Sequence, residues 1–243
     1  MNQPLNTVKN AFSYFIENLF LDLLLEAVGL VMGIVMFFFI EWKIGFDTIF
    51  PFGTLMAAIM LMAFTILNGM SVFARQFNIA IGMGCARKKF LSSYLGTTAV
   101  FLFVEVFFLF LCLEFEKLLY PMIFPQIPWE IELEFSISPL AVLLIVFAML
   151  VIKYGSGVFV LHYGRRGTYI CLFIYMIITL GGSRIAVIIS ENPDSVVAEI
   201  AYGILGAIRS LGVNGGYIAG YLICIILLVL GIRVGLKEEV RQI

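Results

Sequence analysis

Several charged side chains lie inside otherwise apolar stretches of the sequence, where a charge is costly unless it is paired or functional. Asp22 and Glu26 are four residues apart, so they share one face of a helix. Lys153 lies at a depth close to that of Glu26, and Glu105 and Arg184 lie at matching depths in two other stretches. We predict two groupings, Asp22 and Glu26 with Lys153, and Glu105 with Arg184. They either fix helix packing or line a polar pathway.

The segment 71–90 combines aromatic, glycine and basic residues between two apolar stretches. Its pattern predicts a short helix with exposed aromatic side chains, a turn at Gly82 and Gly84, and then the basic run Arg87, Lys88 and Lys89. A helix of this kind suits docking to a partner protein. The alternative is a basic loop that only orients the chain in the membrane.

Residues suited to catalysis or metal binding do not form a recognisable pattern. The single histidine, His162, has no partner serine, and the four cysteines are scattered without a CxxC pair. The sequence contains neither a GxxxxGK[ST] phosphate loop nor an HExxH motif. We therefore expect no catalytic residue, no metal site and no ATP hydrolysis by the chain itself.

The composition requires a membrane environment. Of 243 residues, 62% are hydrophobic and only 13% are charged, whereas soluble domains are about half apolar and a quarter charged. The mean hydropathy of +1.08 excludes intrinsic disorder, and the net charge of −1 argues against a nucleic-acid partner. Since a spanning helix needs about 20 apolar residues, we predict an all-α polytopic membrane protein, a single transmembrane domain over residues 1–243. Its six predicted spans are residues 19–41, 49–71, 91–113, 139–161, 168–189 and 215–234.

Two further segments have an apolar face at helical spacing. Residues 1–18 predict an elbow helix on the inner membrane surface, or else a simple extension of the first span. Residues 190–213 predict an amphipathic helix on the outer side before the sixth span. The loop 114–137, rich in glutamate and proline, is expected to be irregular.

The distribution of basic residues predicts the orientation. With the N-terminus inside, three basic residues fall in outer segments, Lys43, Lys117 and Arg209. Ten fall in cytoplasmic segments: Lys9, Arg75, Arg87, Lys88, Lys89, Arg165, Arg166, Arg233, Lys237 and Arg241. Cytoplasmic loops carry the excess of Lys and Arg, so we expect both termini to face the cytoplasm.

Small residues recur at GxxxG spacing in two spans. Gly29 and Gly33 form such a pair in the first span, and Gly216 and Gly220 form one in the sixth. This spacing permits close contact between helices. A dimer interface through the first span is one interpretation of it.

The segment 71–90 resembles a phrase common in Gram-positive members of the ABC-2-type permease subunits of bacterial ABC exporters. The phrase is an aromatic residue, a glycine, then Arg-Lys and a second aromatic. The plan of the chain is also similar, with an elbow helix, six spans and a re-entrant or interfacial element before the last. The compact peptide exporters, including those of phenol-soluble modulins, look most similar. The matching residues are Phe77, Gly82, Ala86, Arg87, Lys88 and Phe90.

The resemblance implies a permease subunit of an ATP-driven exporter in the bacterial cytoplasmic membrane. It implies an ABC ATPase subunit as partner, which would bind ATP and Mg²⁺, and a second copy of this chain or a related permease. Amphipathic peptides or other hydrophobic molecules would be the substrates, and lipids would surround the spans. Segment 71–90 then resembles the coupling helix that sits in a groove of the ATPase. The residues expected to couple are Phe73, Arg75, Phe77, Gly82, Ala86, Arg87 and Lys88.

Two other classes remain open from the residues alone. A secondary transporter or channel would use Asp22, Glu26 and Glu105 for ion coupling and would need no ATPase. A non-transporting scaffold or immunity protein would bind a peptide or partner without flux.

Overall fold

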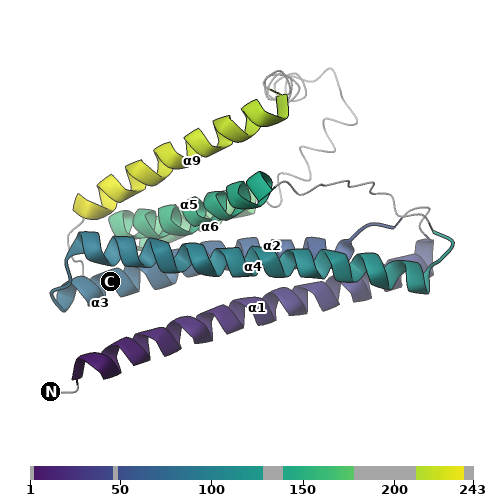
Figure 1. Ribbon diagram of the computed structural model, residues 1–243, viewed down its shortest axis with the longest axis horizontal. Helices are drawn as coiled ribbons and strands as arrows, with labels where there is room; N and C mark the ends of the chain where they lie inside the picture. The colour runs from purple at the N-terminus through teal and green to yellow at the C-terminus, as the bar shows by residue number, and fades with distance from the viewer. Residues whose placement is uncertain (1–2, 46–48, 128–138, 178–211, 238–243) are drawn as a thin grey trace. The chain divides into compact units, whose positions relative to one another are not determined.

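The computed structural model describes residues 3–45, 49–127, 139–177 and 212–237, and within these the side chains of residues 3–18, 44, 213 and 214 are not described. The described residues form helices and contain no strand, which confirms the predicted all-helical class (Figure 1). The elements are α1 (Gln3–Ile44), α2 (Phe52–Asn68), the π-helical turn η1 (Gly69–Phe73), α3 (Ala74–Gly82), α4 (Arg87–Ile123), α5 (Pro139–Tyr163), α6 (Arg165–Met176) and α9 (Gly212–Lys237).

Five helical segments are long and apolar enough to cross a membrane, as expected of a membrane protein. They coincide with the first, second, third, fourth and sixth predicted spans. Most of the predicted fifth span and the predicted outer helix 190–213 lie outside the described residues, so six spans stay a prediction. The five segments are Leu19–Lys43, Phe52–Gly82, Arg87–Ile123, Pro139–Tyr163 and Gly215–Lys237.

Helix α1 is one continuous helix of 42 residues. The structure therefore does not confirm a separate elbow helix followed by a bend. It has the form of the alternative interpretation, in which residues before the first span extend that span. No glycine or proline interrupts the sequence between Leu5 and Val28, so the backbone has no local reason to bend there.

Helix α4 corrects the expectation of an irregular loop from residue 114. It continues to Ile123 and contains Pro121 in its last turn. Proline removes one backbone donor, yet the next turn still closes, because the amide of Phe124 donates to the carbonyl of Tyr120 at 2.8 Å. The helix persists because Glu116 and Tyr120 both point into buried contacts with other helices.

The chain divides into two compact units. The first unit comprises residues 1–67 and 96–149, and the second comprises residues 68–95 and 150–243. Each unit is described separately below.

In the first unit, α1 packs closely against α2. A Cβ atom on Gly33 would lie 2.6 Å from the Cα of Gly53, and one on Gly29 would lie 3.0 Å from the Cα of Ala57. The glycines at GxxxG spacing in the first span thus contact α2 of the same chain, and a dimer interface through this span stays a prediction. Near one end of this packing, the rings of Phe37 and Tyr120 lie 4.6 Å apart in a small core with Ile49.

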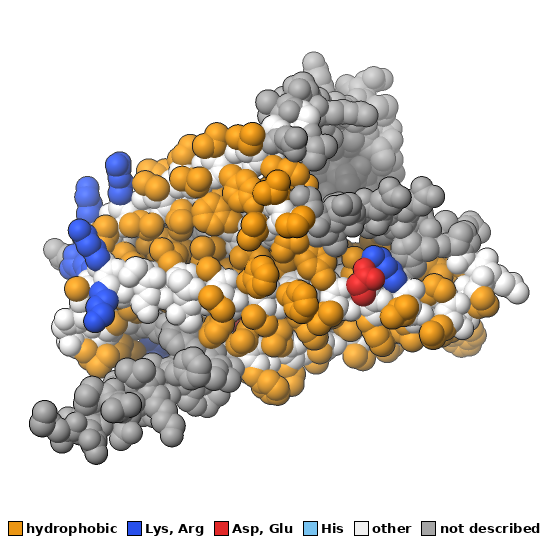
Figure 2. Space-filling model, viewed as in Figure 1, with side chains coloured by type: hydrophobic (Ala, Val, Ile, Leu, Met, Phe, Trp, Pro, Cys, Tyr) orange, Lys and Arg blue, Asp and Glu red, His pale blue; other side chains and the backbone are white. Residues whose placement is uncertain are grey.

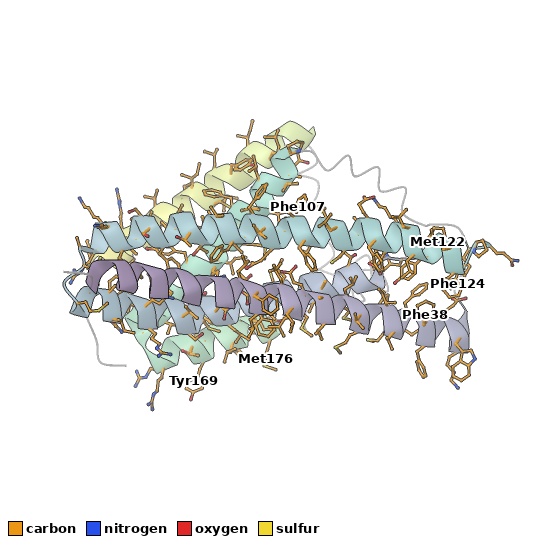
Figure 3. All side chains as sticks on the ribbon, turned by 60° about the horizontal axis from the view of Figure 1, so that its bottom comes forward. Phe38, Phe107, Met122, Phe124, Tyr169 and Met176 are labelled. Carbon is orange, nitrogen blue, oxygen red and sulfur yellow. The ribbon has the colours of Figure 1, made fainter. Side chains whose placement is uncertain are left out.

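Aromatic rings continue this contact between α1 and α4 toward the ends of both helices. Phe38 and Phe124, labelled in Figure 3, have ring centroids 5.5 Å apart. Together with the glycine contacts, they fix which faces of α1, α2 and α4 point inward in the first unit.

In the second unit, three helices meet near the beginning of α4. A Cβ atom on Gly235 of α9 would lie 3.7 Å from both Leu91 of α4 and Val158 of α5. The hydroxyl of Tyr154 donates to the carbonyl of Gly231 at 3.3 Å, which ties α5 to α9. The beginning of α4, the last turns of α5 and the end of α9 therefore lie together.

Candidate functional site

The tip between α3 and α4 (Gly82–Lys89, called the α3–α4 tip) has a defined turn. Gly84 has a φ of +83°, a conformation that glycine adopts without strain. The amide of Cys85 donates to the carbonyl of Ala80, and that of Gly84 donates to the carbonyl of Ile81. This is the Schellman arrangement at a helix end. The predicted turn is confirmed, although α3 continues α2 through η1 instead of forming a separate short helix.

Most of the tip is exposed. Met83 is 73% exposed, and Lys88 and Lys89 are also exposed. Arg87 is half-buried, because its guanidinium donates to the carbonyl of Leu236 at 3.1 Å, near the end of α9. A basic side chain here complements the carbonyls and the negative dipole end of α9. Of the residues predicted to couple, Arg75, Gly82, Ala86 and Lys88 are exposed.

Two of the three aromatic side chains of this segment are buried and the third, Phe90, is half-buried, contrary to the prediction of exposed aromatics. Phe73 and Phe77 are both 0% exposed. Phe73 lies 4.9 Å from Tyr94 of α4 and 5.3 Å from Tyr154 of α5, measured between ring centroids. Phe77 lies 5.7 Å from Phe90. Because the apolar face of η1 and α3 finds helices of the same unit to pack on, these rings are unavailable for docking.

These five residues, Phe73, Phe77, Phe90, Tyr94 and Tyr154, are called the aromatic cluster. It joins η1 and α3 to the first turns of α4 and the middle of α5. The backbones also approach closely, since a Cβ on Gly157 of α5 would lie 2.6 Å from the Cβ of Phe73. A displacement of the α3–α4 tip would therefore be passed directly to α4 and α5.

The tip belongs to a basic end of the second unit. Figure 2 shows Lys and Arg side chains gathered at one end, around the beginning of α4 and the end of α9. The described residues of this unit contain no Asp or Glu. Basic residues near this end are Arg75, Arg87, Lys88, Lys89, Arg165, Arg166, Arg233 and Lys237.

The predicted intramembrane carboxyls of the first unit are buried. Asp22 is 6% exposed, and Glu26 and Glu105 are each 1% exposed. Asp22 and Glu26 share one buried face of α1 with Gly29 and Gly33. Asp22, Glu26 and Glu105, the three buried carboxyls predicted within spans of this unit, are called the acidic cluster.

The pairings predicted between these carboxyls and cationic side chains stay predictions. Lys153 is buried, but it belongs to the second unit, so its pairing with Asp22 and Glu26 stays a prediction. Arg184 lies outside the described residues, and its pairing with Glu105 likewise stays a prediction.

A further buried carboxyl, Glu116, was missed by the sequence reasoning. It is 0% exposed and accepts hydrogen bonds from the backbone amides of Gly53 at 2.8 Å and Thr54 at 2.6 Å, at the beginning of α2. The hydroxyls of Thr54 and Tyr120 also donate to it. A carboxylate at this position satisfies free amides and complements the helix dipole. The spacing of four residues between Glu116 and Tyr120, which places both on one face of a helix, was the sequence signal that could have indicated this contact.

No family model, curated protein or solved structure matches this chain. Its function is therefore inferred from the α3–α4 tip, the aromatic cluster and the buried carboxyls.

Proposed function

We propose that this protein is the membrane subunit of an ATP-driven ABC exporter, with the α3–α4 tip as its contact with an ABC ATPase. The observation that carries the proposal is an exposed basic turn mounted on buried aromatic side chains. Met83, Lys88 and Lys89 are open to a partner, whereas Phe73 and Phe77 anchor the same segment to other helices. Exposed contact residues on a rigid support are what a coupling element needs.

The length of the α2–η1–α3 helix supports this role. The helix runs from Phe52 to Gly82, 31 residues, which corresponds to about 46 Å at 1.5 Å per residue. The hydrocarbon core of a bilayer is about 30 Å thick. The excess of roughly 16 Å allows the tip to stand beyond the lipid tails, where a soluble subunit can reach it.

The proposed movement starts at the tip. Closure of an ATPase dimer would push on Met83 and the neighbouring basic residues, and the aromatic cluster would pass the movement to α4 and α5. Two copies of the chain would surround the pathway. The apolar character of the helices suits an amphipathic peptide or another hydrophobic molecule as the substrate.

The first test is gentle purification from the native membrane, followed by mass spectrometry of what remains bound. We expect a stoichiometric ATPase that carries a P-loop. Its reproducible absence from intact, monodisperse protein would contradict the proposal.

The second test separates docking from folding. Reversing Lys88 and Lys89 to glutamate is expected to weaken ATPase binding and ATP-dependent transport, because the charges that face the partner change sign. The matched control reverses Arg165 and Arg166, an exposed basic pair at the beginning of α6. If the Lys88 and Lys89 variant binds and stimulates the ATPase normally, the tip is not the coupling element.

A second candidate, an ion-coupled secondary transporter, is favoured by one observation. Glu26 lies buried in a predicted span, next to Glu105 and Asp22. This function predicts transport in vesicles that contain no ATPase, driven by a proton or sodium gradient. Replacing Glu105 with Gln would then abolish gradient-driven flux, whereas the exporter would retain ATP-driven flux. Absence of all flux in the unaltered protein would instead favour a scaffold or immunity protein.

A further inference from the structure

The carboxyl group of Glu26 has an unusual environment in the first unit. Glu26 is 1% exposed, and neither of its oxygens has a hydrogen-bond partner among the described residues. Glu116, buried in the same unit, receives hydrogen bonds from backbone amides and hydroxyls. Both glutamates are thus buried in the first unit, but only Glu116 has hydrogen-bond donors.

Among the described side chains of this unit, no titratable group that acts on Glu26 carries a positive charge. The charges that act on it come from Glu105 of α4 and Asp22 of α1, and the thiol of Cys112 lies close by on α4. The second helix, α2, contains no titratable residue, and neither do the residues of α5 that belong to this unit, 139–149. Within the described part of the first unit, the groups that act on Glu26 are therefore acidic, apolar or polar without charge.

An ionised carboxylate in this position would be very costly. A buried ionisable group that has neither hydrogen bonds nor a counter-ion usually becomes neutral. Two negative neighbours add to the cost, since like charges that share a site cannot all ionise. A cation must therefore neutralise Glu26 itself.

The geometry limits which cation can do so. Both carboxyl oxygens of Glu26 are closed off by surrounding atoms, so no volume remains beside them for a hydrated metal ion or an ammonium group of a substrate. A proton requires no such volume, because it becomes part of the carboxyl group. We propose that Glu26 is a proton-binding site within the membrane, and that the acidic cluster of Asp22, Glu26 and Glu105 holds a proton on this residue in the folded state.

The chemistry is a simple protonation. The proton bonds to one Glu26 oxygen, the carboxylate becomes a neutral carboxylic acid, and the negative charge of the cluster falls by one. Release of the proton restores that charge, which favours separation of α1 from α4. Proton binding at Glu26 is thereby linked to the packing of these two helices.

Infrared spectroscopy of the purified protein in lipid tests the proposal directly. The carbonyl stretch of a carboxylic acid is separate from the bands of a carboxylate, so a protonated glutamate at neutral pH is visible. We expect such a band in the unaltered protein and its loss in Glu26→Gln. The matched control is Glu114→Gln, because Glu114 is exposed and ion-paired with Lys117 at 2.6 Å, and this variant should retain the band.

Stability against pH gives a second readout. If the folded state holds a proton that the unfolded chain releases, the folding equilibrium constant falls as pH rises, by about tenfold per pH unit for one proton. Glu26→Gln is permanently neutral and should lose this slope. If Glu26→Gln does not fold, Glu26→Met provides a neutral side chain of similar length.

Three outcomes would overturn the proposal. The unaltered protein could show no carboxylic acid band at neutral pH, which is the result expected if Lys153 pairs with an ionised Glu26. The band could persist in both Glu26 variants, which would assign the proton to another residue. The pH slope could be the same in the unaltered and Glu26 proteins. Neither readout needs an ATPase, so failure here is distinguishable from failure of the exporter assignment.

Discussion

Gly33 of α1 and Gly53 of α2 meet so closely that neither has room for a side chain. A Cβ on Gly33 would lie 2.5 Å from the carbonyl oxygen of Phe52, and one on Gly53 would lie 2.7 Å from a carboxylate oxygen of Glu116. The two glycines thus allow three helices to approach at one level. This close approach also brings the first amides of α2 within hydrogen-bonding distance of Glu116.

Replacing Gly33 with alanine should destabilise the protein. The added methyl group would meet backbone atoms of α2, which cannot move without separating the helices. Overpacking of this kind typically costs about 1–3 kcal/mol. Thermal unfolding in detergent would measure the loss.

The control is Gly216→Ala, in the GxxxG pair of α9, where a Cβ would meet nothing within 4 Å. Alanine is favoured over glycine in a helix by about 0.5–1 kcal/mol, so this variant should be neutral or slightly more stable. Equal destabilisation of both variants would show that Gly33 is not in a close helix contact.

Replacing Glu116 with leucine should remove the acceptor for the first amides of α2. The amides of Gly53 and Thr54, of which the first is buried, and the Tyr120 hydroxyl would lose their charged partner. The expected loss is about 3 kcal/mol in the free energy of unfolding. Hydrogen exchange should also become faster at Gly53 and Thr54. Chemical unfolding and amide exchange provide the two measurements.

Glu114→Leu is the comparison for this variant. Glu114 lies two residues earlier on α4 and makes a surface ion pair with Lys117. Exposed pairs contribute about 0–1 kcal/mol, so its replacement should have a small effect. A loss as large as that of Glu116→Leu would contradict the capping role of Glu116.

Replacing Phe77 with alanine should reduce the stability of this protein itself, because the side chain is not exposed to a partner protein. Phe77 is 0% exposed and packs on Phe73 and Phe90, and truncation of a buried phenylalanine costs about 3–5 kcal/mol. Met83→Ala, at the exposed turn, should leave the unfolding temperature unchanged. A fully stable Phe77→Ala protein would contradict the aromatic cluster.

Replacing Gly84 with alanine should strain the α3–α4 tip. At a φ of +83° an L-residue pays a conformational penalty of roughly 1–2 kcal/mol. Gly82→Ala is the control, because Gly82 lies within α3 and a Cβ there would meet nothing within 4 Å. Comparable melting of the two variants would show that the turn does not require glycine.

The sequence predicted the features that depend on local composition. Apolar stretches of about 20 residues located the five helices that are long enough to cross a membrane, and Gly82 and Gly84 located the turn, because hydropathy and left-handed backbone conformation are local properties. None of these predictions needed knowledge of which helix lies beside which.

Features that depend on helix neighbours were not predictable. The pattern of segment 71–90 could not reveal that Phe73 and Phe77 are covered by α4 and α5, since exposed and buried apolar faces have the same periodicity. Glu116 was assigned to an irregular loop because its local sequence is acidic and followed by Pro121. Only the amides of a distant helix explain why this charge is buried.

The π-helical turn at Gly69–Phe73 has a consequence for engineering the chain. Such a turn takes in an extra residue, and each residue advances a helix by about 100° of rotation. Deleting that extra residue should return the backbone hydrogen bonds to regular α-helical spacing and keep the orientation of the residues beyond it. If the turn instead became regular α-helix with every residue kept, everything beyond it would turn by that angle. The aromatic rings would then face away from Tyr154, and the basic turn would point in a new direction. The π-helical turn therefore determines the rotation of α3 and the α3–α4 tip about the helix axis.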